Sequence, residues 1–293
     1  MTFHIHLGAH KTATTFIQSL LYDNRQRLAK GGVDFVGIWI LRKQFTRRFD
    51  HLSYFDRLFS FIVRPYLRRR LQAVIAERQQ GETFILSDEN LAGLISANYW
   101  TGRLYGFAGA RAKLLAELVA PRKAHFFFCI RRYPDYLTSS WLQMASKGKA
   151  PSFERYLAKF PPSGPGWAEI IMSIAKACGP ENVTVWTYDW FRDDPARVVS
   201  LLAPGMTFDI PEDELRRDVL PSLTTKGLKV MAALEDLLSA GERERMARLL
   251  RNFEFDEPNP RLEITDSALL AAYEAKYRTD LERIAAAGVQ LHA

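Results

Sequence analysis

Cysteine is nearly absent from this sequence of 293 residues, which contains only Cys129 and Cys178. The two are not arranged as a CxxC pair, so we expect two buried thiols rather than a metal site or a redox pair. The six histidines are scattered, without the paired spacing that metal ligands show on a helix. We therefore predict no metal site.

Long hydrophobic runs are also missing. No apolar stretch approaches the roughly 18 residues of a membrane span, and the start lacks a basic segment followed by a long apolar one. We therefore expect a soluble, cytoplasmic protein without a signal peptide or a transmembrane segment. With 47% hydrophobic residues the chain can bury a sizeable core, and we expect residues 1–293 to form a single domain.

Positive charge is concentrated in one segment. Between Leu41 and Gln80, ten lysines and arginines face three acids, so this segment alone carries the formal net charge of +7 of the whole chain. Apolar residues recur there at three- and four-residue spacing, which predicts amphipathic helices. We expect residues 41–80 to be an inserted helical cap with a solvated charged face, or a lid for an anionic or lipid-like acceptor. Peripheral contact with a membrane is a further interpretation, and we expect no binding to nucleic acid.

Short apolar segments predict strands that alternate with helices. They occupy residues 3–7, 32–37, 83–87, 125–130 and 183–188. The run at 125–130 is typical of a central parallel strand that is covered on both faces. We predict an α/β fold, a three-layer P-loop-type domain with a central, mainly parallel sheet of about five strands flanked by helices. Residues 211–293 are predicted to be a helical C-terminal part of the same domain.

The loop after the first predicted strand is a candidate anion site. Residues 8–15 read GAHKTATT, and helical spacing begins at Thr15. A helix that follows a strand through a tight turn presents unpaired N–H groups and the positive end of its dipole to an anion. Lys11 adds a full charge, and Thr12, Thr14 and Thr15 add hydroxyl donors. We therefore predict that this loop holds a phosphate group.

Two classes of phosphate loop compete for this segment. The P-loop of ATP- and GTP-binding proteins follows GxxxxGK[ST], with a glycine directly before the lysine. That position is His10 here, which argues against a nucleotide P-loop. The segment ending in Asp88-Glu89 has a faint similarity to the acidic strand end that holds Mg²⁺ in nucleotide hydrolases. A P-loop kinase or nucleotide hydrolase that uses ATP and Mg²⁺ therefore stays as the alternative.

The loop fits a different family better. It is similar to the 5′-phosphosulfate loop of the PAPS-dependent sulfotransferases, especially bacterial members whose loop runs GxxKTGTT before an apolar residue and a glutamine. Gln18 matches that glutamine, whereas Ala13 stands where the family usually has glycine. Alanine disfavours a positive φ, so this turn needs ordinary dihedrals or some strain.

A second strand-to-helix junction also resembles this family. Arg132 and Pro134, followed by Ser140, match its 3′-phosphate motif, an R-x-P with a serine six residues after the proline. The family's third motif, a basic loop containing glycine, is not recognisable, and Thr225-Lys226-Gly227 is a poor candidate. The resemblance therefore covers two short motifs in the right order.

This resemblance implies transfer of the sulfuryl group of PAPS (3′-phosphoadenosine 5′-phosphosulfate) to a hydroxyl or amine acceptor, which leaves PAP as product. Lys11 would stabilise the leaving phosphate, and Arg132 with Ser140 would bind the 3′-phosphate. No metal is required. The residues implied to hold the 5′ end are Gly8, Ala9, His10, Lys11, Thr12, Ala13, Thr14 and Thr15.

The acceptor needs a base, for which the family uses a glutamate or a histidine. Glu89 follows a predicted strand at the sheet edge where open α/β sheets assemble their sites, so it is our candidate. Partial burial that raised its pKa toward neutrality would suit this role. Asp88, His10 and His51 are the alternatives, and Asp88 or Asn90 could instead cap the next helix. A glycan, glycolipid or small alcohol fits as acceptor, and the sequence does not indicate an oligomeric state.

Overall fold

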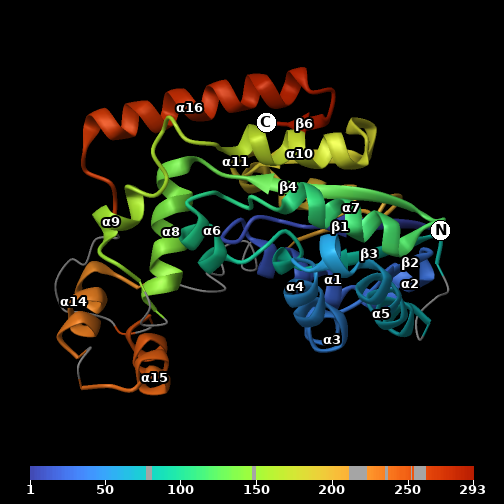
Figure 1. The fold of residues 1–293 in the computed structure, drawn as a ribbon, viewed down its shortest axis with the longest axis horizontal. Coiled ribbons are helices and arrows are strands. Elements are labelled where there is room, and N and C mark those ends of the chain that lie inside the picture. The colour runs from blue at the N-terminus through green and yellow to red at the C-terminus, as the bar shows by residue number, and fades with distance from the viewer. Residues whose placement is uncertain (77–80, 147–149, 211–222, 235–236, 252, 254–261) are drawn as a thin grey trace.

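The computed structural model describes residues 1–76, 81–146, 150–210, 223–234, 237–251, 253 and 262–293 (Figure 1). Its centre is a six-stranded sheet in the order β2-β3-β1-β4-β5-β6, in which all neighbouring strands are parallel. This confirms the predicted α/β class, with one strand more than expected. The strands are β1 (Thr2–His6), β2 (Val33–Phe35), β3 (Thr83–Ser87), β4 (Lys123–Ile130), β5 (Val183–Thr187) and β6 (Gln290–His292).

The additional strand is β6, at the edge of the sheet and close to the end of the chain. It has three residues and pairs with β5, with Gln290 opposite Thr184 and His292 opposite Trp186. So short a segment with two polar residues lacks an apolar run, so periodicity alone does not reveal it. Residues 290–292 thus form a strand at the end of the region that we predicted to be helical. Residues 211–222, 235–236, 252 and 254–261 of that region lie outside the described residues.

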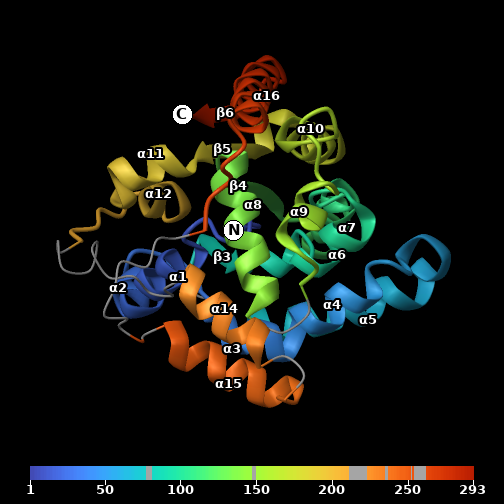
Figure 2. The ribbon, with the colours of Figure 1, turned by 90° about the vertical axis from the view of Figure 1, so that its left-hand side faces the viewer.

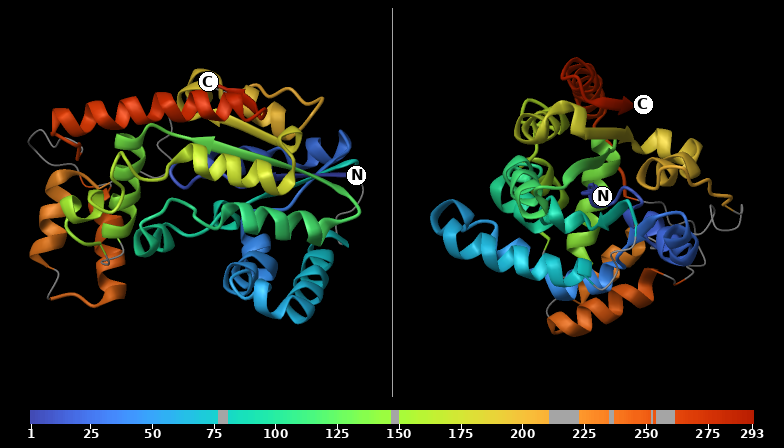
Figure 3. Two further views of the ribbon diagram at one scale, coloured as in Figure 1. Left: turned by 45° about the horizontal axis from the view of Figure 1, so that its top comes forward. Right: turned by 90° about the vertical axis from the view of Figure 1, so that its right-hand side faces the viewer.

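Helices cover both faces of the sheet, which gives the three layers expected (Figure 3). One face carries α1 (Thr14–Asp23), α2 (Arg25–Lys30), α11 (Tyr188–Asp193) and α12 (Pro195–Leu202). The other carries α5 (Asp56–Ala76), α7 (Ala108–Val119), α10 (Trp167–Cys178) and α16 (Ser267–Ala286). Within the described residues, no helix is long and apolar enough to cross a membrane.

The alternation of β1 divides its side chains between these two layers. Phe3 and Ile5 are fully buried in the core under α7 and α10. His4 and His6 point to the opposite face, where His4 Nδ1 lies 2.8 Å from the carbonyl of Leu202 and His6 lies against Trp186. The alternation of apolar residues and histidines in β1 therefore comes from a strand that is buried on both sides, not from one with a solvated face.

The basic segment is helical as its spacing predicts, over α3 (Ile38–Leu41), the π-helical turn η1 (Arg42–Thr46), α4 (Arg47–Leu52) and α5. Phe45 and Phe49 are fully buried in the core. The buried Arg111 of α7 pairs with Asp50 of α4 at 3.0 Å and donates to the carbonyl of Asn90 at 2.8 Å. Arg111 thus connects the basic segment to the residues that follow β3. Residues 77–80 at its end lie outside the described residues.

Several further helices lie at the carboxyl ends of the strands, on the left of Figure 1 and toward the viewer in Figure 2. Leu142 on one of them forms a small separate core with Leu223, Met231, Ala247 and Leu250. These helices are α6 (Ile95–Thr101), α8 (Tyr133–Ala145), α9 (Phe153–Leu157), α14 (Thr225–Ala233) and α15 (Ala240–Arg251).

The order of the strands creates a topological switch point between β1 and β3. These neighbours are followed by helices on opposite faces of the sheet, α1 after β1 and α7 after β3. Open parallel sheets bind ligands at such a switch point, outside the carboxyl ends of the strands. The segments that leave the two strands at this point are residues 7–13 and 88–90.

Candidate functional site

The loop between β1 and α1 has an unusual backbone. Gly8, Lys11 and Ala13 have φ values of 49°, 66° and 59°, all in the left-handed region. A Cβ atom on Gly8 would lie 2.9 Å from Thr14 Oγ1, so glycine is required there by space as well as by conformation. Left-handed residues among right-handed ones turn successive N–H groups into a concavity that suits an anion.

Hydrogen bonds within the loop hold this shape. The hydroxyls of Thr12 and Thr14 both donate to the carbonyl of Ala9, at 2.6 and 3.3 Å. Helix α1 begins at Thr14. The residue before it, Ala13, is at the N-cap position and has no polar side chain to cap the helix, and the first turn carries no acid. An uncapped helix start with no carboxylate leaves its N–H groups and dipole to favour an external anion.

Ala13 resolves a question that the sequence left open. Its φ and ψ of 59° and 20° show that the turn is reached in the left-handed conformation. For a residue with a Cβ this costs about 1 to 2 kcal/mol relative to the right-handed region. The position keeps the backbone shape that glycine adopts readily, at the cost of strain.

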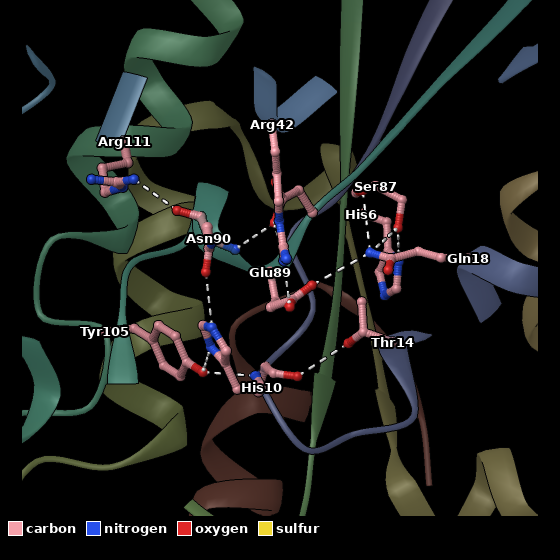
Figure 4. A network of polar contacts seen from close by, with 12 residues as sticks. His6, His10, Thr14, Gln18, Arg42, Ser87, Glu89, Asn90, Tyr105 and Arg111 are labelled. Carbon is pink, nitrogen blue, oxygen red and sulfur yellow. Dashed lines mark hydrogen bonds and ion pairs between the residues drawn. The ribbon is translucent and has the colours of Figure 1, made fainter. Parts of the chain in front are cut away.

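Side chains tie this loop to the end of β3 (Figure 4). His6 Nδ1 lies 2.8 Å from Ser87 Oγ. Gln18 of α1 donates to the Ser87 carbonyl at 3.2 Å and to Glu89 Oε2 at 3.4 Å. The opening loop and the acidic segment are therefore parts of one site.

Both carboxylates after β3 meet Arg42 of the basic segment. Its Nη2 donates to Asp88 Oδ1 at 2.9 Å, and its Nε donates to both Asp88 oxygens at 3.1 and 3.2 Å. Nη2 also lies 2.7 Å from Glu89 Oε1. Asp88 is fully buried and also accepts from the backbone N–H of Asn90 at 3.0 Å. Asp88 therefore caps the short helix η2 (Glu89–Leu91), as one of our two interpretations proposed.

The environment of Glu89 differs from the one we expected for a base. Burial raises the pKa of Glu89, but the nearby His10 and Arg42 more than offset this and bring it below its ordinary value. The pKa of the deeper Asp88 is raised because burial outweighs its bonds to Arg42. Glu89 is thus ionised at neutral pH, and the pKa of Asp88 is shifted in the opposite direction. His10 and Arg42 come from segments far from Glu89 along the chain, so sequence spacing does not reveal this shift.

The two histidine alternatives occupy different surroundings. His10 is buried, with Nδ1 2.8 Å from the hydroxyl of Tyr105 and Nε2 3.0 Å from Asn90 Oδ1. Both of its ring nitrogens are therefore hydrogen bonded. Tyr105 also accepts from Tyr136 at 3.1 Å, which extends the chain of contacts toward α8. His51 is exposed on α4.

The junction of β4 and α8 lies against the opening loop. Arg131 Nη1 donates to the carbonyl of Lys11 at 2.8 Å, and its guanidinium stacks 4.4 Å from the ring centroid of Tyr188. The two strand-to-helix junctions singled out in the sequence are thus in contact. The contact is made by Arg131, next to the arginine of the motif.

Arg132 and Ser140 lie in contrasting places. The Arg132 side chain is 52% exposed and donates to Asp189 at 3.1 Å, with Glu274 at 3.9 Å. Ser140 is fully buried, and its hydroxyl has no hydrogen-bond partner among the described residues. In this arrangement only Arg132 is open to a ligand. Their joint binding of a 3′-phosphate stays a prediction.

Thr225-Lys226-Gly227, the weak candidate for a third binding loop, forms the first turn of α14. The N–H of Gly227 donates to the side chain of Thr224, which caps the helix, at 3.3 Å. Within the described ranges, no group of three or more His, Cys, Asp and Glu side chains is arranged to hold a metal ion.

Sequence reasoning misses several residues of this site. Gln18 belongs to the similar motif, where no role was expected for it, and Arg131 is adjacent to the arginine of the other motif. Arg42 and Tyr105 come from segments about 30 and 95 residues away from the loop, and they carry no local signal. Only the fold brings them to the switch point.

Comparison with known proteins gives one solved structure. No family model matches the sequence, and no curated protein sequence matches it. The chain is similar to a sulfotransferase from Alicyclobacillus acidocaldarius, with 15% sequence identity and a TM-score of 0.44. The match covers 86% of this chain and 96% of that chain.

Proposed function

We propose that this protein is a sulfotransferase that moves the sulfuryl group of PAPS to a hydroxyl or amine acceptor. The observation that carries the proposal is the opening loop at the switch point of the sheet. Three left-handed residues, one of them Lys11, directly precede or lie near the uncapped start of α1, and this supports a site for an anion there. The adjoining Arg131 and Arg132 offer positive charge for a second anionic group.

The donor carries two such groups, and the residues present fit both. PAPS supplies an activated sulfuryl group on its 5′-phosphate. The loop N–H groups, with Lys11, would hold that end. Arg132 would bind the 3′-phosphate in exchange for Asp189, because an ion pair at the surface contributes little and is readily replaced. Ser140 would join Arg132 only if the side chains that bury its hydroxyl move.

Lys11 is the proposed electrostatic catalyst. Negative charge builds on the oxygens of the leaving phosphate during a loose group transfer. A cation fixed in advance at that place is worth on the order of 3 kcal/mol, if it is comparable to one oxyanion-hole donor. Arg131 supports this role because its bond to the Lys11 carbonyl holds the backbone of the loop.

Glu89 is the proposed base. It is ionised, and Gln18 and Arg42 hold its two oxygens at 3.4 and 2.7 Å. The carboxylate would accept the proton that the acceptor hydroxyl loses as its oxygen bonds to sulfur. Its lowered pKa makes it a weaker base than an unpaired buried glutamate. Because Arg42 contributes to this lowering, the basicity of Glu89 depends on the strength of the Arg42 contact. A glycan, glycolipid or small alcohol is the proposed acceptor class.

The alternative is a kinase or nucleotide hydrolase that uses ATP and Mg²⁺. Its strand-end acid would be Asp88, which here is buried, bonded twice to Arg42 and engaged in capping η2. These contacts occupy the oxygens that a metal would need. The site therefore favours the sulfotransferase.

The direct experiment supplies the protein with radiolabelled PAPS and a panel of glycans, glycolipids, alcohols and amines. A parallel set receives ATP labelled at its γ-phosphate, with Mg²⁺. We expect label from PAPS, and none from ATP, in an acceptor. Transfer or release of label from ATP, with PAPS left intact across the panel, would contradict the proposal.

A further inference from the structure

An apolar surface is concentrated at the corner between α4 and α5, outside the site. The described residues expose 15 large hydrophobic side chains, and seven of them fall within 13 consecutive residues. Soluble proteins seldom expose so large an apolar area unless something binds it. We call this surface the corner patch: Tyr54, Phe55, Leu58, Phe59, Phe61, Ile62 and Tyr66.

The helix that carries most of the corner patch is itself packed against the main core. The opposite side of α5 is firmly packed, with Val63, Leu67 and Leu71 buried in the main core. Phe61 and Leu58, by contrast, are 75% and 72% exposed. In Figure 2 the α4 and α5 helices project sideways from the rest of the molecule. The helix is therefore anchored along one side and offers a second apolar side outward.

Positive charge accompanies the corner patch. Phe61, Arg68 and Arg69 line one hollow of about 490 Å³ along α5, so an aromatic ring and two guanidinium groups share a surface. Lys43, Arg47 and Arg48 are exposed on the preceding helical turns.

The acids nearby do not cancel this charge. Asp50 pairs with Arg111 at 3.0 Å, whereas Asp56 and the half-buried Glu117 both pair with Arg64, at 2.8 and 2.7 Å. Asp50 is buried and Asp56 is half-buried. The exposed ions of this surface are thus mainly cations, and an occupant should be both apolar and anionic.

We propose that the corner patch docks the protein on an anionic membrane surface. The aromatic and aliphatic side chains would enter the boundary between headgroups and acyl chains, while Arg68 and Arg69 meet lipid phosphates. A second copy of this chain is a poor occupant, because two such surfaces would bring like charges together. An anionic bilayer satisfies the apolar and the charged part of the surface at once.

Docking does not depend on the proposed function, because it is measured without donor or acceptor. The two are nevertheless connected in the fold. Arg42, which binds Glu89, begins the same helical segment that leads through α4 to the corner patch. Docking would therefore bring the cap of the site to the lipid surface.

The test is flotation of the full-length protein with two kinds of vesicle, phosphatidylcholine alone and phosphatidylcholine with phosphatidylglycerol. We expect binding to the anionic vesicles that weakens as salt is raised, and at least tenfold weaker binding to the neutral ones. Phe61→Ser with Ile62→Ser should weaken binding about tenfold or more, because burial of these side chains drives insertion. Arg68→Glu with Arg69→Glu should have at least as large an effect.

Matched variants separate docking from general changes in polarity or charge. Leu237→Ser with Leu249→Ser removes side chains that are 76% and 67% exposed elsewhere. Lys30→Glu with Arg192→Glu makes the same change in charge on the other face of the sheet. Both control variants should bind like the wild type, and all four variants should keep the wild-type melting temperature.

Three results would overturn the proposal. One is a lack of binding to anionic vesicles at low salt. Another is binding that the corner variants and the control variants weaken equally. The third is a dimer in sedimentation experiments that Phe61→Ser with Ile62→Ser dissociates, since a second copy would then cover the surface.

Discussion

The opening loop and the β4–α8 junction both carry motifs that resemble phosphate-binding motifs, but only the loop has a backbone already shaped for an anion. In the loop, Thr12 and Thr14 hold the Ala9 carbonyl, and the backbone is already curved around a place for an anion. At the junction, Arg132 is half exposed and bonded to Asp189, while Ser140 is buried away from solvent.

The difference follows from which atoms do the binding. The loop would bind through backbone N–H groups, whose directions are fixed once the turn is formed. The junction would bind through side-chain atoms, which can pair with other groups until a ligand displaces them. We therefore expect the loop to determine whether the donor reacts and the junction to determine which donor is chosen.

Removal of the proposed base should have the largest effect. We expect Glu89→Gln to abolish transfer while PAP affinity stays largely intact, because glutamine keeps the size of the side chain but cannot take a proton. Turnover with PAPS and calorimetry with PAP measure the two quantities. Glu82→Gln, at the other end of β3, should leave both unchanged. Wild-type turnover in Glu89→Gln would remove Glu89 from the role.

Lys11 tests the loop itself. Lys11→Met should lower kcat by about 100-fold or more, since the loss of a fixed charge partner costs about 3 kcal/mol in the transition state. Lys30→Met changes an exposed lysine of α2 and should have no effect. A fall in PAPS affinity with kcat preserved would show that Lys11 only binds the donor.

Arg132 tests the junction. Arg132→Ala should weaken PAP binding about tenfold or more, because a hydrogen bond to a charged group is worth about 1.5 to 3 kcal/mol. Binding of adenosine 5′-phosphosulfate, which lacks a 3′-phosphate, should hardly change. Arg192→Ala removes a neighbouring exposed arginine as the control. Equal losses for both ligands would mean that Arg132 does not recognise the 3′-phosphate.

The pH profile tests the contact between Arg42 and Glu89. Arg42 is one of the charges that lower the pKa of Glu89, so Arg42→Gln should raise it. Because the base must be deprotonated, activity should then be lost at a higher pH as the medium is acidified. Lys43→Gln, at the next position, should keep the wild-type profile. An acid limb that stays in place or moves to lower pH would contradict this role for Arg42.

The smallest effect concerns strain in the loop. Ala13→Gly should stabilise the protein by about 0.5 to 1 kcal/mol, because relief of the left-handed alanine outweighs the extra entropy of an unfolded glycine. Ala29→Gly, on the exposed side of α2, should instead destabilise it by a similar amount. Denaturant unfolding measures both. Destabilisation by both changes would mean that the turn at Ala13 is not strained.

Features that depend on residues close together along the chain, such as strands and the turns after them, can be predicted from the sequence. The apolar runs locate five of the six strands, and the residues after β1 and β4 identify two junctions that the fold brings into contact. Strand β6 cannot be predicted in this way, because three residues paired at the edge of a sheet need no apolar pattern. Arg42, Tyr105 and the burial of Ser140 depend on how distant segments pack, and no local pattern records that.

The most direct test of the central claim is calorimetry of the wild-type protein with PAP and, separately, with ATP and Mg²⁺. We expect that PAP binds, that adenosine 5′-phosphosulfate binds more weakly because it lacks a 3′-phosphate, and that ATP with Mg²⁺ produces no measurable heat. Tight binding of ATP with Mg²⁺ and none of PAP would contradict it and assign the loop to a nucleotide-hydrolysing or phosphoryl-transferring enzyme.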